Sequence, residues 1–275
     1  MSVRDDRERA DAGGGTEKRM RLRYAGVCRA CGATLDAGVT AVYDRATKAV
    51  RCDVCPGDSA EVDDGAAGAS ARREHLRRVE RREQRIRAKH PKLGALILAL
   101  SEEPQSTRAW ESGGLGEERV AKALEAMPEG RRVLHDRRIP GTRANIDHIV
   151  VSPAGVWVVD AKRYRGQRPS LQIDGGIFRP RVEQLRVGGR LRTNLVHGVR
   201  KQVELVTEAL GGEVPVNGAL CFVDADWPLF GGTFSVDDIL VCWPTYLVGR
   251  LGGGPDADVD VPTVHARLAN HFPTA

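Results

Sequence analysis

Two apolar segments, NIDHIVV and VWVVDAK, carry the residues whose types and spacing are best suited to chemistry. They are separated by Ser-Pro-Ala-Gly, which is typical of a turn between two strands. If Val151 pairs with Val156 across this turn, the antiparallel register of the two strands is fixed. That register places Asp147 directly opposite Asp160. Because side chains alternate along a strand, Lys162 emerges on the same face as the two aspartates.

Two carboxylates that face each other between strands of Val, Ile and Trp repel one another and destabilise the sheet. A divalent cation between Asp147 and Asp160 removes this cost, and oxygen ligands of this kind suit Mg²⁺ or Mn²⁺. Lys162 is then placed to orient or deprotonate a water molecule, or to stabilise charge on a phosphorane. The alternative is a strand-end ion pair between Asp160 and Lys162, with Asp147 facing water.

A third acid is expected from the helical sequence GLGEERVAKALEAM. Glu117 shares one helical face with the apolar residues Val120 and Leu124, so its side chain is expected to point inward. The alternative is a first-turn glutamate that only complements the helix dipole.

These motifs together resemble the nuclease-related domain (NERD) family. They are Gly113-x-x-Gly116-Glu117, Asn145-Ile-Asp147-His148, Pro153-x-Gly155-Val156 and Asp160-Ala-Lys162-x-Tyr164-x-Gly166, within about residues 113–210. That family is placed among the PD-(D/E)xK nucleases of restriction-endonuclease-like fold. The resemblance implies a Mg²⁺- or Mn²⁺-dependent nuclease that hydrolyses phosphodiester bonds of nucleic acid, with DNA favoured. It implies a metal held by Asp147 and Asp160, and these catalytic residues: Glu117, Asp147, Asp160 and Lys162.

Two further polar residues are candidates to line this site. Asn145 lies opposite Lys162 in the expected register. Members of the family tend to carry Asn-Pro and then a Gln entering the last helix. Here Leu195 follows Asn194, which departs from that pattern, and Gln202 is the corresponding glutamine. Gln202 either lines the site or is a solvated helix residue.

Four cysteines near the N-terminus have the spacing of a metal site. Two C-x2-C pairs, 20 residues apart, can each clamp one side of a tetrahedral Zn²⁺, and a short hairpin is expected between them. The pattern resembles a zinc ribbon with a structural zinc, and its alternatives are disulfides or uncoordinated thiols. Whether such a module binds nucleic acid, binds protein or serves as a scaffold stays open. The expected ligands are Cys28, Cys31, Cys52 and Cys55.

Basic residues gather in two places. Residues 71–90 form an arginine-rich helical stretch, which either binds phosphates or is a solvated helix with internal ion pairs. Arg143 precedes the two strands that carry Asp147 and Asp160, and Arg163 and Arg165 follow Asp160. These three arginines are candidate nucleic-acid contacts or ordinary rim charges.

Composition sets the broad class of the protein. The chain has 275 residues, 41% of them hydrophobic, which is enough for a core and argues against disorder as a whole. Its net charge of +5 weakly favours a polyanionic partner. The charged start lacks the apolar core of a signal peptide, and no apolar run is long enough for a membrane span. We therefore expect a cytoplasmic, reduced protein with no membrane partner.

The expected architecture is α/β, a restriction-endonuclease-like mixed sheet flanked by helices, with a small zinc-ribbon-like module before it. His148 is expected on the face opposite Asp147, where it packs or forms a hydrogen bond, and Cys221 and Cys242 are expected to be buried thiols. The expected parts are a disordered tail (1–21), the ribbon (22–56), a flexible linker (57–70), a basic and a connecting helix (71–112), the nuclease-like domain (113–248) and a C-terminal extension (249–275).

Two other functions compete with the nuclease. The first is a catalytically silent nucleic-acid-binding protein that uses the ribbon and the basic helix. The second is an adaptor whose ribbon recruits a protein partner. An intact acid-acid-x-lysine set favours the enzyme, because a binding-only protein has less reason to keep buried charges.

Overall fold

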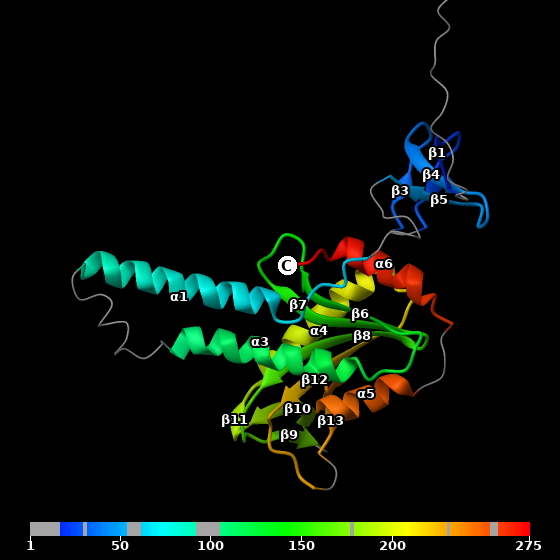
Figure 1. Cartoon of the computed structure of the whole chain (residues 1–275). Helices are drawn as coiled ribbons and strands as arrows, with labels where there is room; N and C mark the ends of the chain where they lie inside the picture. Colours follow the sequence, from blue (N-terminus) through cyan, green and yellow to red (C-terminus); the bar gives the residue numbers. More distant parts are fainter. Residues whose placement is uncertain are drawn as a thin grey trace, which may run out of the picture. The chain divides into compact units, whose positions relative to one another are not determined.

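The computed structural model (Figure 1) describes residues 17–29, 32–53, 62–91, 105–176, 179–229, 232–253 and 258–275, without the side chains of residues 105–111 and 252. The chain divides between Glu61 and Val62 into two compact units. Among the described residues, no helix has the length and hydropathy needed to cross a membrane. Of the connecting helix expected within residues 71–112, residues 92–104 lie outside the described part of the chain.

The N-terminal unit consists of short antiparallel strands around a small core of Leu22, Cys28, Leu35 and Ala41. One sheet has the order β1-β4-β5, and β2 pairs with β3. The strands are β1 (Glu17–Arg21), β2 (Gly26–Val27), β3 (Thr34–Leu35), β4 (Thr40–Asp44) and β5 (Ala49–Cys52).

The hairpin predicted between the cysteine pairs is confirmed as β4–β5. Asp44 closes its turn by accepting hydrogen bonds from the Ala46 N–H and the Thr47 hydroxyl. The prediction of a disordered tail through residue 21 is wrong for Glu17–Arg21, because pairing with β4 satisfies the backbone groups of that segment.

The C-terminal unit is built on a six-stranded sheet of order β13-β14-β12-β8-β7-β6. The neighbours β6, β7 and β8 pair antiparallel, whereas β12 runs parallel to both β8 and β14. The predicted mixed α/β class is therefore confirmed. The strands are β6 (Arg132–Arg138), β7 (Asn145–Ser152), β8 (Gly155–Arg163), β12 (Val216–Val223), β13 (Phe234–Val236) and β14 (Ile239–Cys242).

Helices cover both faces of this sheet (Figure 1). One apolar cluster joins the sheet to α3 and α5, and a second joins it to α4 and α6. Asp260 caps α6 by accepting the Thr263 N–H, and Pro244 begins α5, where a missing N–H costs nothing. The helices are α3 (Gln105–Leu124), α4 (Thr193–Ala209), α5 (Pro244–Gly252) and α6 (Val261–His271).

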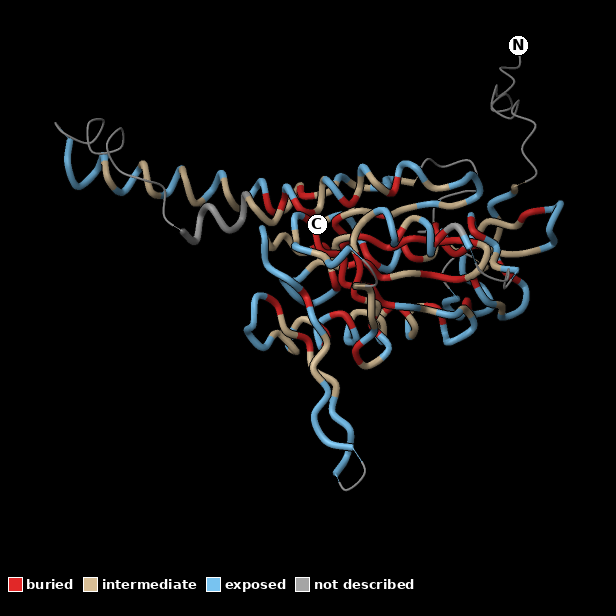
Figure 2. Tube along the Cα trace, turned by 90° about the horizontal axis from the view of Figure 1, so that it is seen from below, coloured by how far each residue is buried: buried red, intermediate tan, exposed pale blue. Residues whose placement is uncertain are grey.

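Two further elements complete the unit. A small antiparallel sheet of β9 (Pro169–Gly176), β10 (Arg179–Val187) and β11 (Arg190–Leu191) follows β8. Helix α1 (Ala69–Lys89) packs against α3 near its start and projects away from the sheet, where it is mostly exposed (Figure 2). Ala71 is its one buried residue among those described.

Three expected boundaries are corrected by this arrangement. The helix expected over GLGEERVAKALEAM, from Gly114, begins at Gln105. The supposed linker through residue 70 ends in the first turn of α1, and the Asp64 carbonyl accepts the His135 N–H of β6, so its last residues are fixed to the sheet. The supposed C-terminal extension contains α6, whose Leu268 is fully buried in the main core.

Arg137 joins three parts of the C-terminal unit. Arg137 is 2% exposed, and its guanidinium donates hydrogen bonds to the carbonyls of Asp63 at 2.8 Å, Ala269 at 2.9 Å and Phe272 at 2.7 Å. One β6 side chain therefore ties the segment before α1 and the end of α6 to the sheet.

We predict that Arg137→Met lowers the free energy of unfolding by about 3 kcal/mol, because three carbonyls lose the donor that a buried guanidinium supplies. Urea denaturation measures the change. Arg132→Met, in the exposed part of the same strand, is the matched control and should stay within about 0.5 kcal/mol of the unsubstituted chain. Equal effects of the two substitutions would contradict the role given to Arg137.

Candidate functional site

The hairpin β7–β8 has the register predicted from the sequence. Val151 pairs with Val156, and the last recorded pair before the strands separate is His148 with Val159. Asp147 is the next residue along β7, and its carboxylate accepts the Ala161 N–H at 2.8 Å in place of a backbone ladder bond. The Asp147 carboxylate therefore lies between the two strands where their backbone pairing ends.

Asp160 and Lys162 form the ion pair that the sequence left open as an alternative. Their Nζ and Oδ2 atoms lie 2.5 Å apart, and the side chains are 14% and 26% exposed. Burial acts to lower the pKa of Lys162, but the charges of Asp160 and Asp147 outweigh burial and raise it. The lysine is therefore held as an ammonium ion at neutral pH.

Asp147 does not face water as the ion-pair alternative requires. Burial, and next the negative charge of Asp160, raise the pKa of Asp147 to about 7, against the lowering effect of Lys162 and the Ala161 N–H. The two aspartates therefore repel each other through a poorly solvated space, as the sequence predicted.

Glu117 reaches the same acid centre from α3. Its Oε2 accepts the Gly68 N–H at 3.0 Å. Burial, followed by the charges of Asp147 and Asp136, raises its pKa to about 8. The predicted inward orientation of Glu117 is confirmed, and a helix-dipole role alone does not describe it.

Asp136 is a fourth acid of this centre that sequence reasoning missed. It is 3% exposed, has the left-handed φ of 49°, and lies across from Asp147 in the β6–β7 register. Its carboxylate accepts the Ser70 N–H at 2.6 Å, the Ser70 hydroxyl at 2.8 Å and the Asn145 amide at 2.9 Å. No sequence signal distinguishes it from an ordinary strand aspartate.

Asn145 and Gln202 meet beside these acids. The Asn145 amide nitrogen donates to Asp136 and to the Ser70 hydroxyl, which fixes the orientation of its amide group. The Gln202 amide nitrogen lies 3.5 Å from the Asn145 carbonyl. Their remaining side-chain oxygens are buried and have no hydrogen-bond donor among the described residues. Buried acceptors without donors are costly, and a cation or its water ligands can satisfy them.

The set of oxygen donors therefore fits a hard divalent cation. It offers the carboxylates of Asp147 and Asp160 and the amide oxygens of Asn145 and Gln202, which are the ligand types that Mg²⁺ and Mn²⁺ take. Among the described residues, no three His, Cys, Asp or Glu side chains are grouped as metal ligands. The fit thus rests on two carboxylates and neighbouring neutral oxygens.

The three candidate arginines differ in their surroundings. Arg143 and Arg165 are exposed, Arg165 to 75% of its side chain. The Arg163 side chain is only 6% exposed, and its Nε donates to Asp224 at 2.9 Å. We therefore correct the expectation for Arg163, which is a buried partner of Asp224 and not a surface for phosphates.

Other predicted side chains lie away from the acids. His148 is buried on the far face as expected, and its Nδ1 lies 2.8 Å from Nδ1 of His135. Cys221 and Cys242 are buried neighbours on β12 and β14, and hydrogen bonding between the thiols, together with burial, raises the pKa of Cys221.

In the N-terminal unit, Cys28 and Cys52 come together. Cys28 is 1% exposed, and its Sγ accepts the Cys52 N–H at 3.2 Å. Cys31 and Cys55 lie outside the described residues. The structure thus brings one cysteine of each C-x2-C pair into contact.

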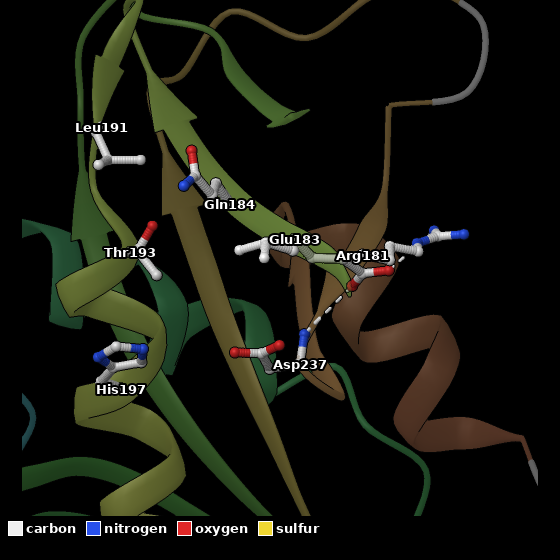
Figure 3. A pocket seen from close by; sticks show the side chains of 8 residues that line it. Arg181, Glu183, Gln184, Leu191, Thr193, His197 and Asp237 are labelled. Carbon is white, nitrogen blue, oxygen red and sulfur yellow. Dashed lines mark hydrogen bonds and ion pairs between the residues drawn. The ribbon is translucent and has the colours of Figure 1, made fainter. Parts of the chain in front are cut away.

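A pocket of about 480 Å³ opens between β10, the start of α4 and the turn between β13 and β14 (Figure 3). Both polar and apolar side chains line the pocket, and none of the four residues of the acid centre is among them. The pocket is therefore a feature separate from the acid centre. Its labelled side chains are Arg181, Glu183, Gln184, Leu191, Thr193, His197 and Asp237.

Fold and site together define a mixed α/β domain with a buried carboxylate–lysine centre. Residues 112–223 of the chain match the family model of the nuclease-related domain, NERD. This region contains Glu117, the hairpin and Gln202, and the match relates the domain to nucleases and to nucleic acid as a partner. No curated protein and no solved structure matches the chain significantly.

The raised pKa values of Glu117 and Asp147 make the stability of the metal-free chain depend on pH. The folded state keeps protons that the unfolded state releases near the ordinary carboxyl pKa, so their stabilisation is complete below that pKa. It is lost progressively as the pH rises from the ordinary carboxyl pKa to about 7 for Asp147 and to about 8 for Glu117. We predict that the free energy of unfolding in EDTA falls over this range, and falls less in Glu117→Gln.

Urea titrations at a series of pH values measure this dependence. Glu118→Gln is the matched control, because Glu118 is the next residue, is 42% exposed and pairs with Arg72. A Glu117→Gln variant with the same pH dependence as Glu118→Gln would contradict the burial of charge at Glu117.

Proposed function

We propose that the C-terminal unit is a metal-dependent nuclease that hydrolyses phosphodiester bonds of nucleic acid, with DNA as the favoured substrate. The observation that carries the proposal is the pair Asp147 and Asp160, which meet where β7 and β8 separate with Lys162 beside them. The match of residues 112–223 to the nuclease-related domain supports the same reaction class. A restriction-endonuclease-like core of the PD-(D/E)xK type is part of the proposal.

In this mechanism, Asp147 and Asp160 would hold one Mg²⁺ or Mn²⁺ ion, and Glu117 adds a third acid next to them. The ion, when bound, neutralises charge on the scissile phosphate and makes an adjacent water more acidic. The unpaired oxygens of Asn145 and Gln202 accept hydrogen bonds from water at the same place. These side chains therefore orient the water that attacks phosphorus.

Lys162 supplies positive charge to the reacting phosphate. Asp160 and Asp147 raise its pKa, which favours a charged lysine over one that takes a proton from water. The ammonium group is a hydrogen-bond donor to the oxygens whose negative charge grows as water adds and a P–O ester bond breaks. The ion pair with Asp160 keeps this ammonium group beside the carboxylates that would hold the metal.

We predict that the full chain cleaves DNA in the presence of Mg²⁺ or Mn²⁺ and that EDTA abolishes cleavage. Asp160→Ala and Lys162→Ala should each lower the rate by about 100-fold or more, because each removes a charge that acts on the transition state. Labelled duplex and single-stranded oligonucleotides, resolved on gels, measure the rate.

The matched controls are Asp174→Ala on β9 and Lys201→Ala on α4, which replace exposed residues of the same types. Both should cleave like the unsubstituted chain. Cleavage that persists in Lys162→Ala and Asp160→Ala would reject the site. DNA binding without cleavage under either metal would favour the silent nucleic-acid-binding protein.

We also propose a structural Zn²⁺ in the N-terminal unit, held by Cys28, Cys31, Cys52 and Cys55 in a zinc-ribbon-like module. The approach of Cys28 to Cys52 supports it, as does the small core of this unit, which metal ligation can reinforce. A complete set of four thiolates leaves no open position, so no catalysis is assigned to it.

Elemental analysis of the purified chain should find about one zinc per chain, as a four-cysteine site requires. Replacing Cys28 and Cys52 by serine should remove the zinc. Replacing Cys221 and Cys242, the buried thiols of the sheet, is the matched control and should leave it. Zinc that stays bound after Cys28 and Cys52 are replaced would contradict the proposed zinc site.

A further inference from the structure

The positive charge of the chain is concentrated in helix α1. Its 21 residues contain nine arginines and lysines against three glutamates, an excess of six, whereas the whole chain has a net charge of +5. The rest of the chain is therefore close to neutral. The positive charge of α1 is therefore a property of this helix and not of the protein as a whole.

The basic residues of α1 include one regular row. Arg73, Arg77, Arg81, Arg85 and Lys89 recur at every fourth position and are all exposed. With a rise of 1.5 Å per residue, the row extends over about 24 Å. Every fourth residue of a helix follows a ridge on its surface, so these side chains form one continuous line.

Internal ion pairs neutralise only part of this helix. Glu74 pairs with Arg77 and Arg78, and Glu83 pairs with Arg87. Among the described residues, no ion pair involves the outer members of the row, which are Arg81, Arg85 and Lys89. The reading of α1 as a solvated helix held by its own salt bridges therefore leaves the outer row unexplained.

The start of α1 is bonded to the acid centre. The Gly68 N–H donates to Glu117, and Ser70 donates twice to Asp136. Gly68 has φ of 69°, and a Cβ there would lie 2.9 Å from the carbonyl oxygen of Gly114 in α3. Only glycine allows this approach, so the helix is fixed to α3 at the carboxylates.

We propose that α1 is an arm that holds the sugar-phosphate backbone of duplex nucleic acid and extends the proposed active site outward from its acids. Phosphates are the partner that an exposed line of arginines fits best, because guanidinium groups bind their oxygens with charge and two hydrogen bonds. At about 3.4 Å per base pair, the 24 Å row matches roughly seven base pairs. This inference rests on the proposed nucleic-acid substrate, and it places the phosphate backbone of that substrate along α1.

Binding in EDTA tests the arm without any hydrolysis. The probe is a fluorescein-labelled 24-base-pair DNA duplex, and fluorescence anisotropy gives the dissociation constant at several salt concentrations. In Arg81→Gln/Arg85→Gln/Lys89→Gln, the slope of log affinity against log salt should fall by about 2 to 3, because three phosphate contacts are lost. Glutamine keeps helix propensity, and circular dichroism checks that the helix content is unchanged.

The matched control is Arg179→Gln/Arg190→Gln/Lys201→Gln, which removes the same charge from exposed positions on β10, β11 and α4. This variant should keep the slope of the unsubstituted chain. On a duplex of about six base pairs, too short for the row, the arm variant should differ less from the unsubstituted chain.

Three results would overturn the arm. They are equal loss of slope in both triple variants, an unchanged slope in the arm variant, and no duplex binding at all. Binding to phosphatidylserine vesicles that is lost in the arm variant while duplex binding is kept would assign α1 to a lipid surface. Absence of cleavage with Mg²⁺ rejects the proposed nuclease but not the arm, since the arm is measured without metal.

Discussion

The cost of burying several carboxylates together governs the C-terminal unit. Asp136 is satisfied by three donors and Asp160 by Lys162, whereas Asp147 and Glu117 each accept one backbone N–H. Burial outweighs these two N–H groups and raises the pKa values of Asp147 and Glu117. Two acids with poorly compensated charge thus lie at one place, beside the ion pair of Asp160 and Lys162. Under the proposed function, a cation held by Asp147 and Asp160 would offset this repulsion.

Local geometry made the hairpin of the site predictable. The Ser-Pro-Ala-Gly turn, in which Gly155 takes φ of 131°, sets the register of β7 and β8, and alternation then decides which side chains share a face. The position of Glu117 followed in the same way from helical spacing. Each of these inferences needed only residues within a few positions of one another, or two strands joined by one turn.

Residues that depend on distant partners were not predictable in this way. Asp136 belongs to the site through Ser70, which precedes it by 66 residues, and Arg163 is removed from the surface by Asp224, which follows it by 61. Composition misled in a similar manner at GDSAEVDDGAAGAS, whose small residues suggested a flexible linker. A Cβ at Gly65 would lie 2.2 Å from the His135 carbonyl oxygen, so glycine there permits close packing. The same composition serves flexibility in one context and contact in another.

The placement of this segment bears on the choice between an enzyme and a binding protein. A protein that only binds nucleic acid needs exposed cations, which α1 supplies beyond its first turns, and it gains nothing from buried acids. Yet the root of α1 is bonded to two of those acids, Glu117 through Gly68 and Asp136 through Ser70. Under the proposed function, this connection would lead a phosphate backbone held by α1 toward the acids. The hydrogen bonds between the start of α1 and these two acids therefore support the proposed nuclease over a protein that only binds nucleic acid.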